Sequence, residues 1–442
     1  METLVGPGAV DGLDFEAIET AARRQALRVA ARVIERRFNS DTSDHAGPAL
    51  PCACGQPARY AGRHNKTFTT ALGELTLSRA YYYCEPCAAG FCPRDRALGL
   101  QDSSLSPATT RMVGKSASMV SFGESSELMH ELAGVSVDAK QVERTAEALG
   151  REIACDERSV IEPSMPTAPT MYLGMDGTGV PVRTSELEGR KGKQSDGSAK
   201  TREVKLVTTW TAQRYDKEGV PVRDPGSVSY SAAIESAASR DTDDSLSDFA
   251  QRVEREARRS GFEQAQRRVV LGDGAPWIWN LADEQFPGAV QIVDLFHAKG
   301  HLWDAAKAIY GAASELGVQW GKERRDELEE GKIDAVLAEL RVHAAANDEA
   351  RKCVGYLTNN RQRMRYPEFR AQGLCTSTGV VEAGCKTVVG TRLKRAGMRW
   401  TIAGADAIIA LRCCVLSGRF EDFWERRSAA GANGCTAVIS QN

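Results

Sequence analysis

The sequence predicts an α/β core that is interrupted by an all-helical insertion and preceded by smaller modules. Two strand-like runs end in the acidic residues Asp176 and Asp273. Residues 298–370 follow the last predicted strand and show almost continuous helical periodicity. A further helical segment then bears Glu382. Strands, a long helical stretch and an acid-bearing helix, in this order, are what such an interrupted core requires.

Length and composition indicate a globular protein of several compact units. The chain has 442 residues, of which 42% are hydrophobic and 26% are charged, and these values exclude wholesale disorder. The most apolar run, residues 407–416, is too short to cross a bilayer and contains Arg412. The first residues lack the basic start and apolar core of a secretory signal. We therefore expect a cytoplasmic protein with no membrane partner.

The formal net charge of −2 argues against a nucleic-acid partner, but the distribution of charge does not. Acidic residues concentrate in segments 241–263 and 323–339, whereas residues 351–399 are rich in Arg and Lys. A protein that is acidic in total can therefore still present a basic face to phosphates.

Clustered cysteines in a reducing cytosol indicate metal ligands more often than disulfides. Two close pairs flank a segment that is typical of a β-hairpin turning at Leu72 and Gly73. Four thiolates can bind a tetrahedral Zn²⁺, and a structural metal would stabilise so small a module. Cys92 and His64 are reserve ligands, and a reduced, metal-free hairpin is the alternative. The expected zinc ligands are Cys52, Cys54, Cys84 and Cys87.

Residues 123–150 have the pattern of two short amphipathic helices joined by a turn at residues 133–136. A glycine in such a turn is typical of a helix-turn-helix DNA-binding motif, and Ser136 is placed to cap the second helix. A helical hairpin that only serves as scaffold has the same pattern. The side chains expected to reach a DNA groove are Lys140, Gln141 and Arg144.

Asp176 and Asp273 are each predicted at the end of a strand, where acids of an α/β core can converge on one rim. Together with Glu382 they offer the carboxylates that two Mg²⁺ ions require for phosphoryl transfer. The run MDGTGVP also suggests a haloacid-dehalogenase-type phosphatase. That chemistry needs a nucleophilic Asp at position 174, which is Gly174, and is therefore excluded.

The motif Asp294-Leu-Phe-His297 directly follows a predicted strand. Its position favours the same rim, where His297 can hold a phosphate or transfer a proton. His301 lies one helical turn further on and is expected to be structural.

A basic segment surrounds Glu382. Its cations can offset the charge of a scissile phosphate, and its tryptophan can stack on an unpaired base. The alternative is a solvated helix face with the tryptophan in the core. The expected DNA-binding residues here are Lys386, Arg392, Lys394, Arg395, Arg399 and Trp400.

The chain resembles the ISKra group of bacterial insertion-sequence transposases, which are DDE-type enzymes related to Mutator-like transposases. The resemblance extends in order from about Cys52 to Trp424, and the first cysteine pair and the near-neutral charge depart from it. The segments that resemble this group, besides the paired cysteines, are 172–183, 269–287, 293–304 and 377–400.

The resemblance implies an RNase H-like core with an all-α insertion and a catalytic triad of Asp176, Asp273 and Glu382. In Mutator-like transposases a motif of Asp or Cys, two residues and His lies between the second Asp and the Glu, and Asp294 and His297 match it. The implied activity is Mg²⁺- or Mn²⁺-dependent cleavage at transposon ends, followed by transfer of the 3′-OH into target DNA.

The implied partners are double-stranded DNA, as terminal inverted repeats and as target, and further copies of the chain in a dimer or larger multimer. The expected location is the nucleoid of a bacterial cytoplasm. A catalytically inactive or domesticated DNA-binding protein is the alternative.

The expected organisation places a proline-rich linker at Pro163, Pro166 and Pro169 in front of the core. The expected parts are an N-terminal helix and linker (1–50), a zinc-binding hairpin (51–100), a helix-turn-helix-like DNA-binding domain (101–160), the first part of the core (170–297), the helical insertion (298–372), the Glu helix with C-terminal helices (373–428) and a tail (429–442).

Overall fold

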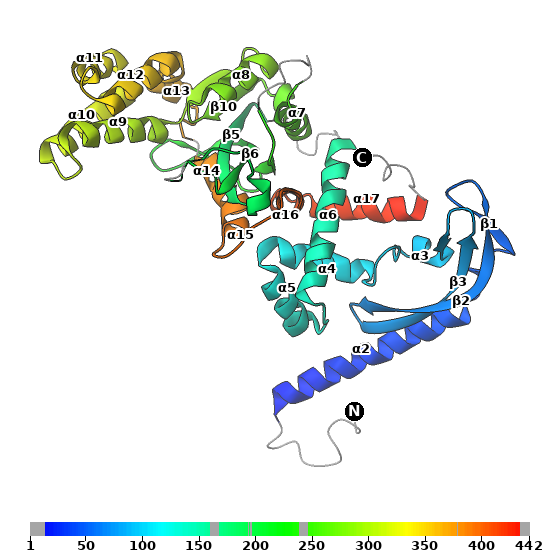
Figure 1. The fold of residues 1–442 in the computed structure, drawn as a ribbon. Helices are drawn as coiled ribbons and strands as arrows, with labels where there is room; N and C mark the ends of the chain where they lie inside the picture. Colours follow the sequence, from blue (N-terminus) through cyan, green and yellow to red (C-terminus); the bar gives the residue numbers. More distant parts are fainter. Residues whose placement is uncertain are drawn as a thin grey trace. The chain divides into compact units, whose positions relative to one another are not determined.

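The computed structural model describes residues 14–159, 168–192, 194, 197–237, 246–377 and 379–433 (Figure 1). It divides into two compact units. We call Met1–Leu149 with Phe420–Asn442 the N-terminal unit and Gly150–Arg419 the core unit. Pro163 and Pro166 of the predicted linker and residues 434–442 of the predicted tail lie outside the described residues.

The N-terminal unit begins with the long helix α2 (Phe15–Ser40), which confirms the predicted helix. Asp14 caps it by accepting hydrogen bonds from the first turn. The later part of α2 is tied to the following sheet, because Asn39 bonds the backbone of Thr76 and Ser78. Large apolar side chains of this helix are left uncovered, since Phe15 is 71% exposed and Val33 is 62% exposed.

A four-stranded antiparallel sheet follows, in the order β1 (Ala49–Pro51), β2 (Pro57–Thr70), β3 (Gly73–Cys84) and β4 (Ala89–Phe91). Strands β2 and β3 form the predicted hairpin, and Gly73 begins β3 with a φ of 105° that favours glycine. Buried side chains alternate along β3, as expected of a sheet with one covered face.

The remaining helices of the N-terminal unit include the predicted helix-turn-helix segment. Gly134 makes the turn in the left-handed conformation, as expected. The second helix is capped by Asp138, whose carboxylate accepts from the amides of Lys140 and Gln141, so the prediction for Ser136 is wrong. These helices are α3 (Pro93–Ala97), α4 (Pro107–Met119), α5 (Phe122–Leu128), η1 (Met129–Ala133), the first part of α6 (Ala139–Ser159) and α17 (Phe420–Asn433).

The core unit contains a five-stranded mixed sheet in the order β11-β10-β5-β6-β9. Strands β5, β10 and β11 are parallel, and β6 is antiparallel to both of its neighbours. The strand predicted to end at Asp176 continues as β5 up to Pro181. The strands are β5 (Thr170–Pro181), β6 (Thr201–Thr211), β9 (Ser229–Ala233), β10 (Arg267–Gly272) and β11 (Val290–Val293), with a separate small hairpin of β7 (Arg214–Tyr215) and β8 (Pro221–Val222).

The central strands have consecutive buried residues, as expected of a sheet that is covered on both faces. The long helical stretch predicted after β11 is confirmed and forms a group beside the sheet in Figure 1. Helices that accompany the sheet are α7 (Asp248–Ser260), α8 (Pro276–Gln285), α14 (Gly379–Gly384), η5 (Cys385–Gly390), α15 (Thr391–Leu393) and α16 (Ile402–Leu416), with short turns η2 (Thr184–Glu186) and η3 (Phe262–Gln264). The helical stretch comprises α9 (Leu295–Tyr310), α10 (Glu315–Glu329), α11 (Ile333–Ala344), α12 (Asp348–Asn360), η4 (Arg361–Arg363) and α13 (Tyr366–Ala371).

Among the described residues, no helix combines the length and the apolar character that a bilayer-spanning segment requires.

A fully buried carboxylate, Glu256 on α7, is the centre of an ion-pair network in the core unit. Its oxygens lie 3.0 Å from guanidinium nitrogens of Arg259 and Arg419, and Ser229 on β9 donates to it. Arg419 also pairs with Glu157 of α6 at 3.0 Å. Burial alone would raise the pKa of the Glu256 carboxyl, but the charges of Arg419 and Arg259 hold that pKa below its ordinary value.

We expect Glu256→Gln to destabilise the core unit by about 3–5 kcal/mol, because it leaves two buried guanidinium groups without their shared carboxylate. Glu254→Gln on the same helix should cost at most about 1 kcal/mol, because its pair with Arg258 is partly exposed. Urea-induced unfolding at neutral pH measures both values.

The same comparison has a defined pH dependence. Because the pKa of Glu256 is lowered in the folded state, its contribution is present above the ordinary value of 4.5 and is lost as the pH falls through the folded-state pKa. The difference in free energy of unfolding between wild type and Glu256→Gln should therefore become smaller as the pH falls below 4.5. Equal losses in the two variants at neutral pH would contradict a buried ion pair at Glu256.

Candidate active site

The parallel strands of the core unit place three aspartates close together. Asp273 directly follows β10, and the β10–β5 register, in which Leu271 pairs with Gly174, brings it level with Asp176. Asp176 lies within β5 rather than at its end, because the strand continues to Pro181. Asp294 directly follows β11, and its amide donates to the carbonyl of Gly272 at 2.8 Å.

The turn after β10 is held from two sides. The Asp273 carboxylate accepts from the amide of Ala275 at 2.9 Å, and the Tyr356 hydroxyl on α12 donates to the Asp273 carbonyl at 2.8 Å. Gly274 has a φ of 101°, and a Cβ there would lie 2.4 Å from the Tyr356 ring. A glycine is therefore required both by backbone conformation and by space.

The N-terminus of α9 is held equally firmly. Asp294 caps the helix, because its carboxylate accepts from the amide of His297 at 2.5 Å. The amide of Leu295 donates to the carbonyl of Thr376 at 2.9 Å. These bonds fix the backbone from which His297 extends.

Glu382 comes from α14, which lies directly on the sheet. A Cβ on Gly174 would meet Val381 at 2.1 Å, and a Cβ on Gly384 would meet Tyr230 at 2.9 Å, so these glycines permit the close approach. The Glu382 side chain is 64% exposed and pairs with Lys386 at 2.8 Å.

A π-helical segment, η5, follows α14 immediately. Such segments are rare in proteins, and those that occur are often found at functional sites. Arg412 of α16, only 4% exposed, supports it from within the core. Its guanidinium donates to the carbonyl of Val388 at 2.7 Å, to the carbonyl of Thr387 and to the hydroxyl of Thr391 at 3.0 Å. Burial lowers the pKa of Arg412 to about 10, which still leaves it protonated at neutral pH.

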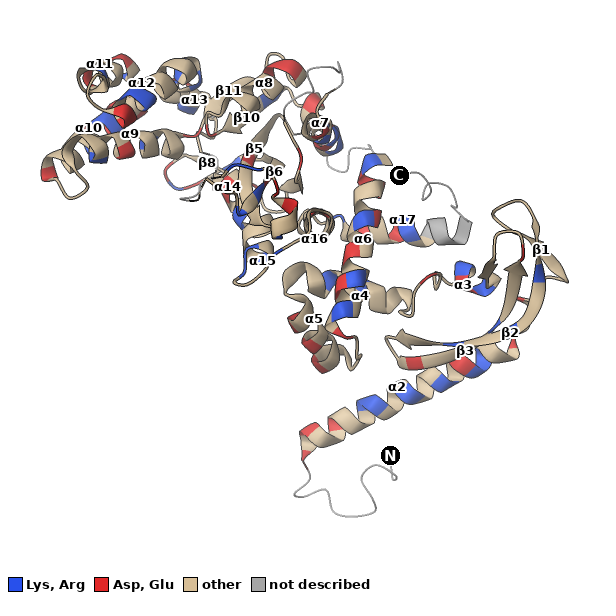
Figure 2. Ribbon diagram, viewed as in Figure 1, with Lys and Arg blue, Asp and Glu red and all other residues tan. Residues whose placement is uncertain are grey.

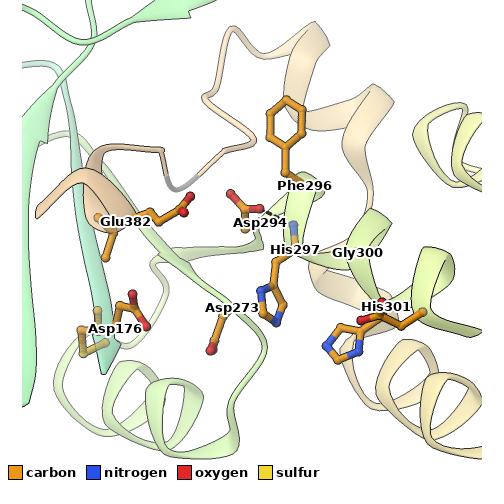
Figure 3. Close-up of a pocket in the computed structure, with 11 residues that line it drawn as sticks. Asp176, Asp273, Asp294, Phe296, His297, Gly300, His301 and Glu382 are labelled. Atoms are coloured by element: carbon orange, nitrogen blue, oxygen red, sulfur yellow. Dashed lines mark hydrogen bonds between the residues drawn. The ribbon is translucent and has the colours of Figure 1, made fainter. Parts of the chain in front are cut away.

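The structure brings all five predicted catalytic residues to one cleft of about 490 Å³ (Figure 3). Among the described residues, the four paired cysteines form the only group with three or more potential metal-ligand atoms within 4.8 Å of one another. The carboxylates therefore line the cleft without meeting at one point. Residues at the cleft that the sequence analysis did not predict as catalytic are Met175, Phe296, Gly300, His301, Asp304 and Val381.

Burial raises the pKa of Asp176, and the neighbouring Asp273 carboxylate raises it further. The Gly177 amide, which donates at 2.6 Å, the thiol of Cys385 and the charge of His297 act in the opposite direction. The net effect is a carboxyl that is harder to ionise than usual. A cation in the cleft would therefore favour its ionised form.

His301 is a residue of α9 whose ring lies between those of His297 and Tyr356. Its ring is 4.1 Å from that of Tyr356 and 4.9 Å from that of His297, centroid to centroid. Burial lowers the pKa of His301, and the neighbouring His297 lowers it further. His301 is thus packed against aromatic rings, as its predicted structural role requires, although it also lines the cleft.

The donors at the cleft fit a hard divalent cation. Carboxylates of Asp176, Asp273, Asp294 and Glu382 line the cleft, and His297 adds an imidazole. Oxygen ligands are those that Mg²⁺ and Mn²⁺ prefer, whereas thiolates, which would favour softer metals, do not line the cleft in the described residues.

The basic segment beside Glu382 divides into exposed and buried residues. Arg392 is fully buried under the ring of Trp400, at 5.2 Å from its centroid. The Trp400 indole donates to the carbonyl of Leu393 at 3.0 Å. The prediction that Arg392 and Trp400 contact DNA is therefore wrong, because both side chains belong to the core. The exposed members are Lys386, Lys394, Arg395 and Arg399.

The residues predicted to contact DNA on α6 remain a prediction. Lys140 and Arg144 are exposed, although Lys140 pairs with Glu143 at 2.7 Å, and Gln141 is half-buried. Figure 2 shows several Lys or Arg positions along α2, which the sequence analysis did not single out. The exposed arginines of α2 are Arg23, Arg24, Arg28, Arg32, Arg36 and Arg37.

The paired cysteines of the N-terminal unit form a compact four-sulfur set. The sulfur atoms of Cys52, Cys54, Cys84 and Cys87 all lie within 4.8 Å of one another. The backbone amide of Cys54 lowers the pKa of the Cys52 thiol to about 7, which favours the thiolate that metals bind. Burial and the neighbouring thiols raise the pKa of Cys84 and of Cys87, so ionisation of the whole set requires a bound cation. This set can hold a structural metal such as zinc. Its first pair closes the set despite having only one spacer residue.

Neither reserve ligand belongs to this set. Cys92 is buried and precedes α3, and the His64 ring stacks on Tyr81 at 4.1 Å between centroids.

No protein-family model and no curated protein matches the sequence. Among solved structures, the chain is similar to one titled "Drosophila P element transposase strand transfer complex", with 10% sequence identity and a TM-score of 0.28. The match covers 76% of this chain and 84% of that chain.

We expect Cys84→Ser to abolish zinc binding, because it removes the buried member of a four-thiolate set. Cys92→Ser should retain about one zinc per chain. Elemental analysis of the purified proteins measures the metal, and thermal unfolding with and without a chelator measures its contribution to stability. Equal zinc content in the two variants would exclude this cysteine set as the site.

We expect Arg412→Met to destabilise the core unit by about 3 kcal/mol, because it leaves the buried carbonyls of Thr387 and Val388 without this donor. Arg412→Lys should lose less, and the exposed Arg399→Met should change stability by at most about 0.5 kcal/mol. Hydrogen exchange at residues 385–391 reports local opening of η5, and unchanged exchange in Arg412→Met would refute the supporting role.

Proposed function

We propose that this chain is a DDE-type DNA transposase of the kind that its sequence resembles. The observation that supports this most is the common cleft of Asp176, Asp273 and Glu382, which come from β5, the end of β10 and α14. These are the acids that the resemblance implies as a catalytic triad. Asp294 and His297, the motif residues between the second and third acid, line the same cleft.

The topology of the core unit supports an RNase H-like assignment. Numbered along the chain, the five strands lie in the order fifth, fourth, first, second and third, and only the second is antiparallel to its neighbours on both sides. This strand order, with one strand antiparallel to both neighbours, supports the RNase H-like core that the resemblance implies. The helical stretch from α9 to α13 lies between the last strand and the Glu382 helix, as the all-α insertion of the resemblance requires.

Asp176, Asp273 and Glu382 are the residues that would hold two Mg²⁺ or Mn²⁺ ions. When bound, such ions stabilise the attacking and leaving oxygens of a phosphoryl displacement. The protein orients its ligands for this role through the Gly177 amide on Asp176 and the Tyr356 hydroxyl on the backbone of Asp273.

The reaction consists of two displacements at phosphorus. In the first, water attacks the scissile phosphate at the transposon end, the bond to the 3′-oxygen breaks, and that oxygen takes up a proton. In the second, the freed 3′-OH loses its proton and attacks a target phosphate, whose own 3′-oxygen departs. His297, exposed at the cleft, can give and take these protons.

DNA binding would rest on two groups of basic residues. Lys386, Lys394, Arg395 and Arg399 are exposed, follow the Glu382 helix in the chain and would contact the phosphates near the cut. In the N-terminal unit, α6 and the arginine-rich α2 would bind the terminal inverted repeats. We further propose a dimer or larger multimer that pairs two ends, acting at the nucleoid of a bacterial cytoplasm.

A catalytically inactive or domesticated DNA-binding protein is the second candidate. The ion pair between Lys386 and Glu382 favours an inactive protein, because Lys386 neutralises one of the three acids that would bind metal. The pair is largely exposed, however, and exposed ion pairs of this kind contribute at most about 1 kcal/mol. A divalent cation can therefore displace Lys386, and we favour the enzyme.

We expect Asp273→Asn to reduce cleavage and strand transfer by about 1,000-fold or more, because loss of a metal-binding carboxylate removes several kcal/mol of transition-state stabilisation. DNA binding should change by less than about twofold. The substrate is a donor plasmid bearing the DNA that flanks the coding sequence, with Mg²⁺ or Mn²⁺, and a gel-shift titration measures binding.

Glu284→Gln on the exposed face of α8 is the matched control and should cleave as wild type does. If wild type and Glu382→Gln give equal excision, the DNA-binding protein is the correct function. If Asp273→Asn also loses DNA binding, Asp273 is structural and its assignment is wrong.

A further inference from the structure

A second cleft, of about 770 Å³, opens in the core unit next to the acid cleft. The two clefts share Phe296 of α9. They also meet along α14, where Val380 lines the second cleft and the next residues, Val381 and Glu382, line the first. A ligand in the second cleft would therefore lie next to a ligand bound by the acids of the first cleft.

Phe296 is 66% exposed, which is unusual for a large aromatic side chain on a well-fixed backbone. The Asp294 cap on one side and the Leu295–Thr376 hydrogen bond on the other hold its position. Its neighbour Leu295 is only 3% exposed, so the helix already has its apolar anchor at this turn. Phe296 thus contributes little to the core and offers its ring to the two clefts.

The chemistry of the second cleft fits a nucleobase better than a phosphate. Apolar side chains, among them Trp210 and Val380, form much of its lining. Its charged residues are three cations and two acids, and two of the cations, Lys299 and Arg370, share the acid Glu329. The other two charged residues are Arg223 and Glu218. A free anion would find few unpaired cations there, whereas a flat, uncharged base can stack on Phe296. The volume lies within the range of ordinary ligand pockets and has room for one nucleotide.

We propose that this second cleft binds one unpaired nucleotide of the DNA strand, adjacent to the scissile phosphate, with its base stacked on Phe296. The inference rests on the proposed transposase function and specifies how the same site holds its substrate. Taking one base out of the duplex would fix the register of the strand, so that a single phosphate faces Asp176, Asp273 and Glu382.

Photocrosslinking tests the contact directly. 5-Iododeoxyuridine is placed, one position at a time, at the nucleotides on both sides of the cleavage site in an end-containing duplex. Irradiation of the complex with the full-length chain should join one position to Phe296, as mapped by mass spectrometry, and Phe296→Leu should abolish that product. A crosslink only to other residues, from every position, would overturn the proposal.

Cleavage rates test the role. Phe296→Ala should slow cleavage of a fully paired end by about tenfold or more, and Phe296→Trp should restore most of the rate, because the ring supplies the stacking. A mismatch at the flanking pair should also rescue Phe296→Ala, since that base is already unpaired. Leu316→Ala, which removes a 69% exposed apolar side chain from α10, should cleave at the wild-type rate.

The outcomes separate this proposal from the function on which it rests. If wild type cleaves, and Phe296→Ala cleaves both paired and mismatched ends at the wild-type rate, the proposed nucleotide-binding cleft is wrong while the transposase assignment stands. If wild type cleaves no end with Mg²⁺ or Mn²⁺, both are wrong. A slow Phe296→Ala variant that neither the mismatch nor Phe296→Trp rescues would show a structural role and would also overturn the proposal.

Discussion

The parallel pairing of β10 with β5 on one side and β11 on the other is the constraint on which the candidate site depends. It places Asp273 and Asp294 after neighbouring strands and Asp176 at the level of Asp273. Electrostatics alone opposes this arrangement, because burial and the charge of Asp273 both raise the pKa of Asp176. The backbone hydrogen bonds of buried strands therefore hold together acids that would otherwise separate, as functional sites often require.

Glu382 is positioned in a different way, by packing of its helix against the sheet, because this helix lies far along the chain from the strands. Gly174 lets Val381 reach the sheet, and Cys385, one turn beyond Glu382, bonds the Asp176 carboxylate. Arg412 then supports the π-helical segment that follows. The acid-bearing helix is thus fixed by packing at its start and by a buried guanidinium at its end, while Glu382 itself remains exposed and free to respond to a ligand.

Periodicity and position along the chain were sufficient to predict strands β5, β10 and β11 and the long helical stretch, because each depends on local pattern. Strand β9 was not predicted, and the catalytic role of the acids stays a prediction. The sequence pattern did not predict which side chains of the basic segment after Glu382 are buried. Arg392 and Trp400 looked like a DNA-binding pair by charge and type, yet they stack on each other in the core. The cap at Asp138 was misassigned to Ser136 because serine and aspartate are both preferred N-cap residues and the pattern does not fix the first residue of α6. Phe296 stood within a recognised motif, but only the structure shows that its ring is exposed between two clefts.

Tyr356 gave no sequence signal, although it links the helical stretch to the site. Its hydroxyl holds the carbonyl of Asp273, its ring fills the space that Gly274 leaves, and it packs on His301. The same helical stretch supplies His297 and Phe296 from α9. Helix α9 therefore forms one wall of the cleft, and α12 supports it through Tyr356. A sheet with the same acids but without these two helices would lack the His297 imidazole, the support of Asp273 and the aromatic edge of the second cleft.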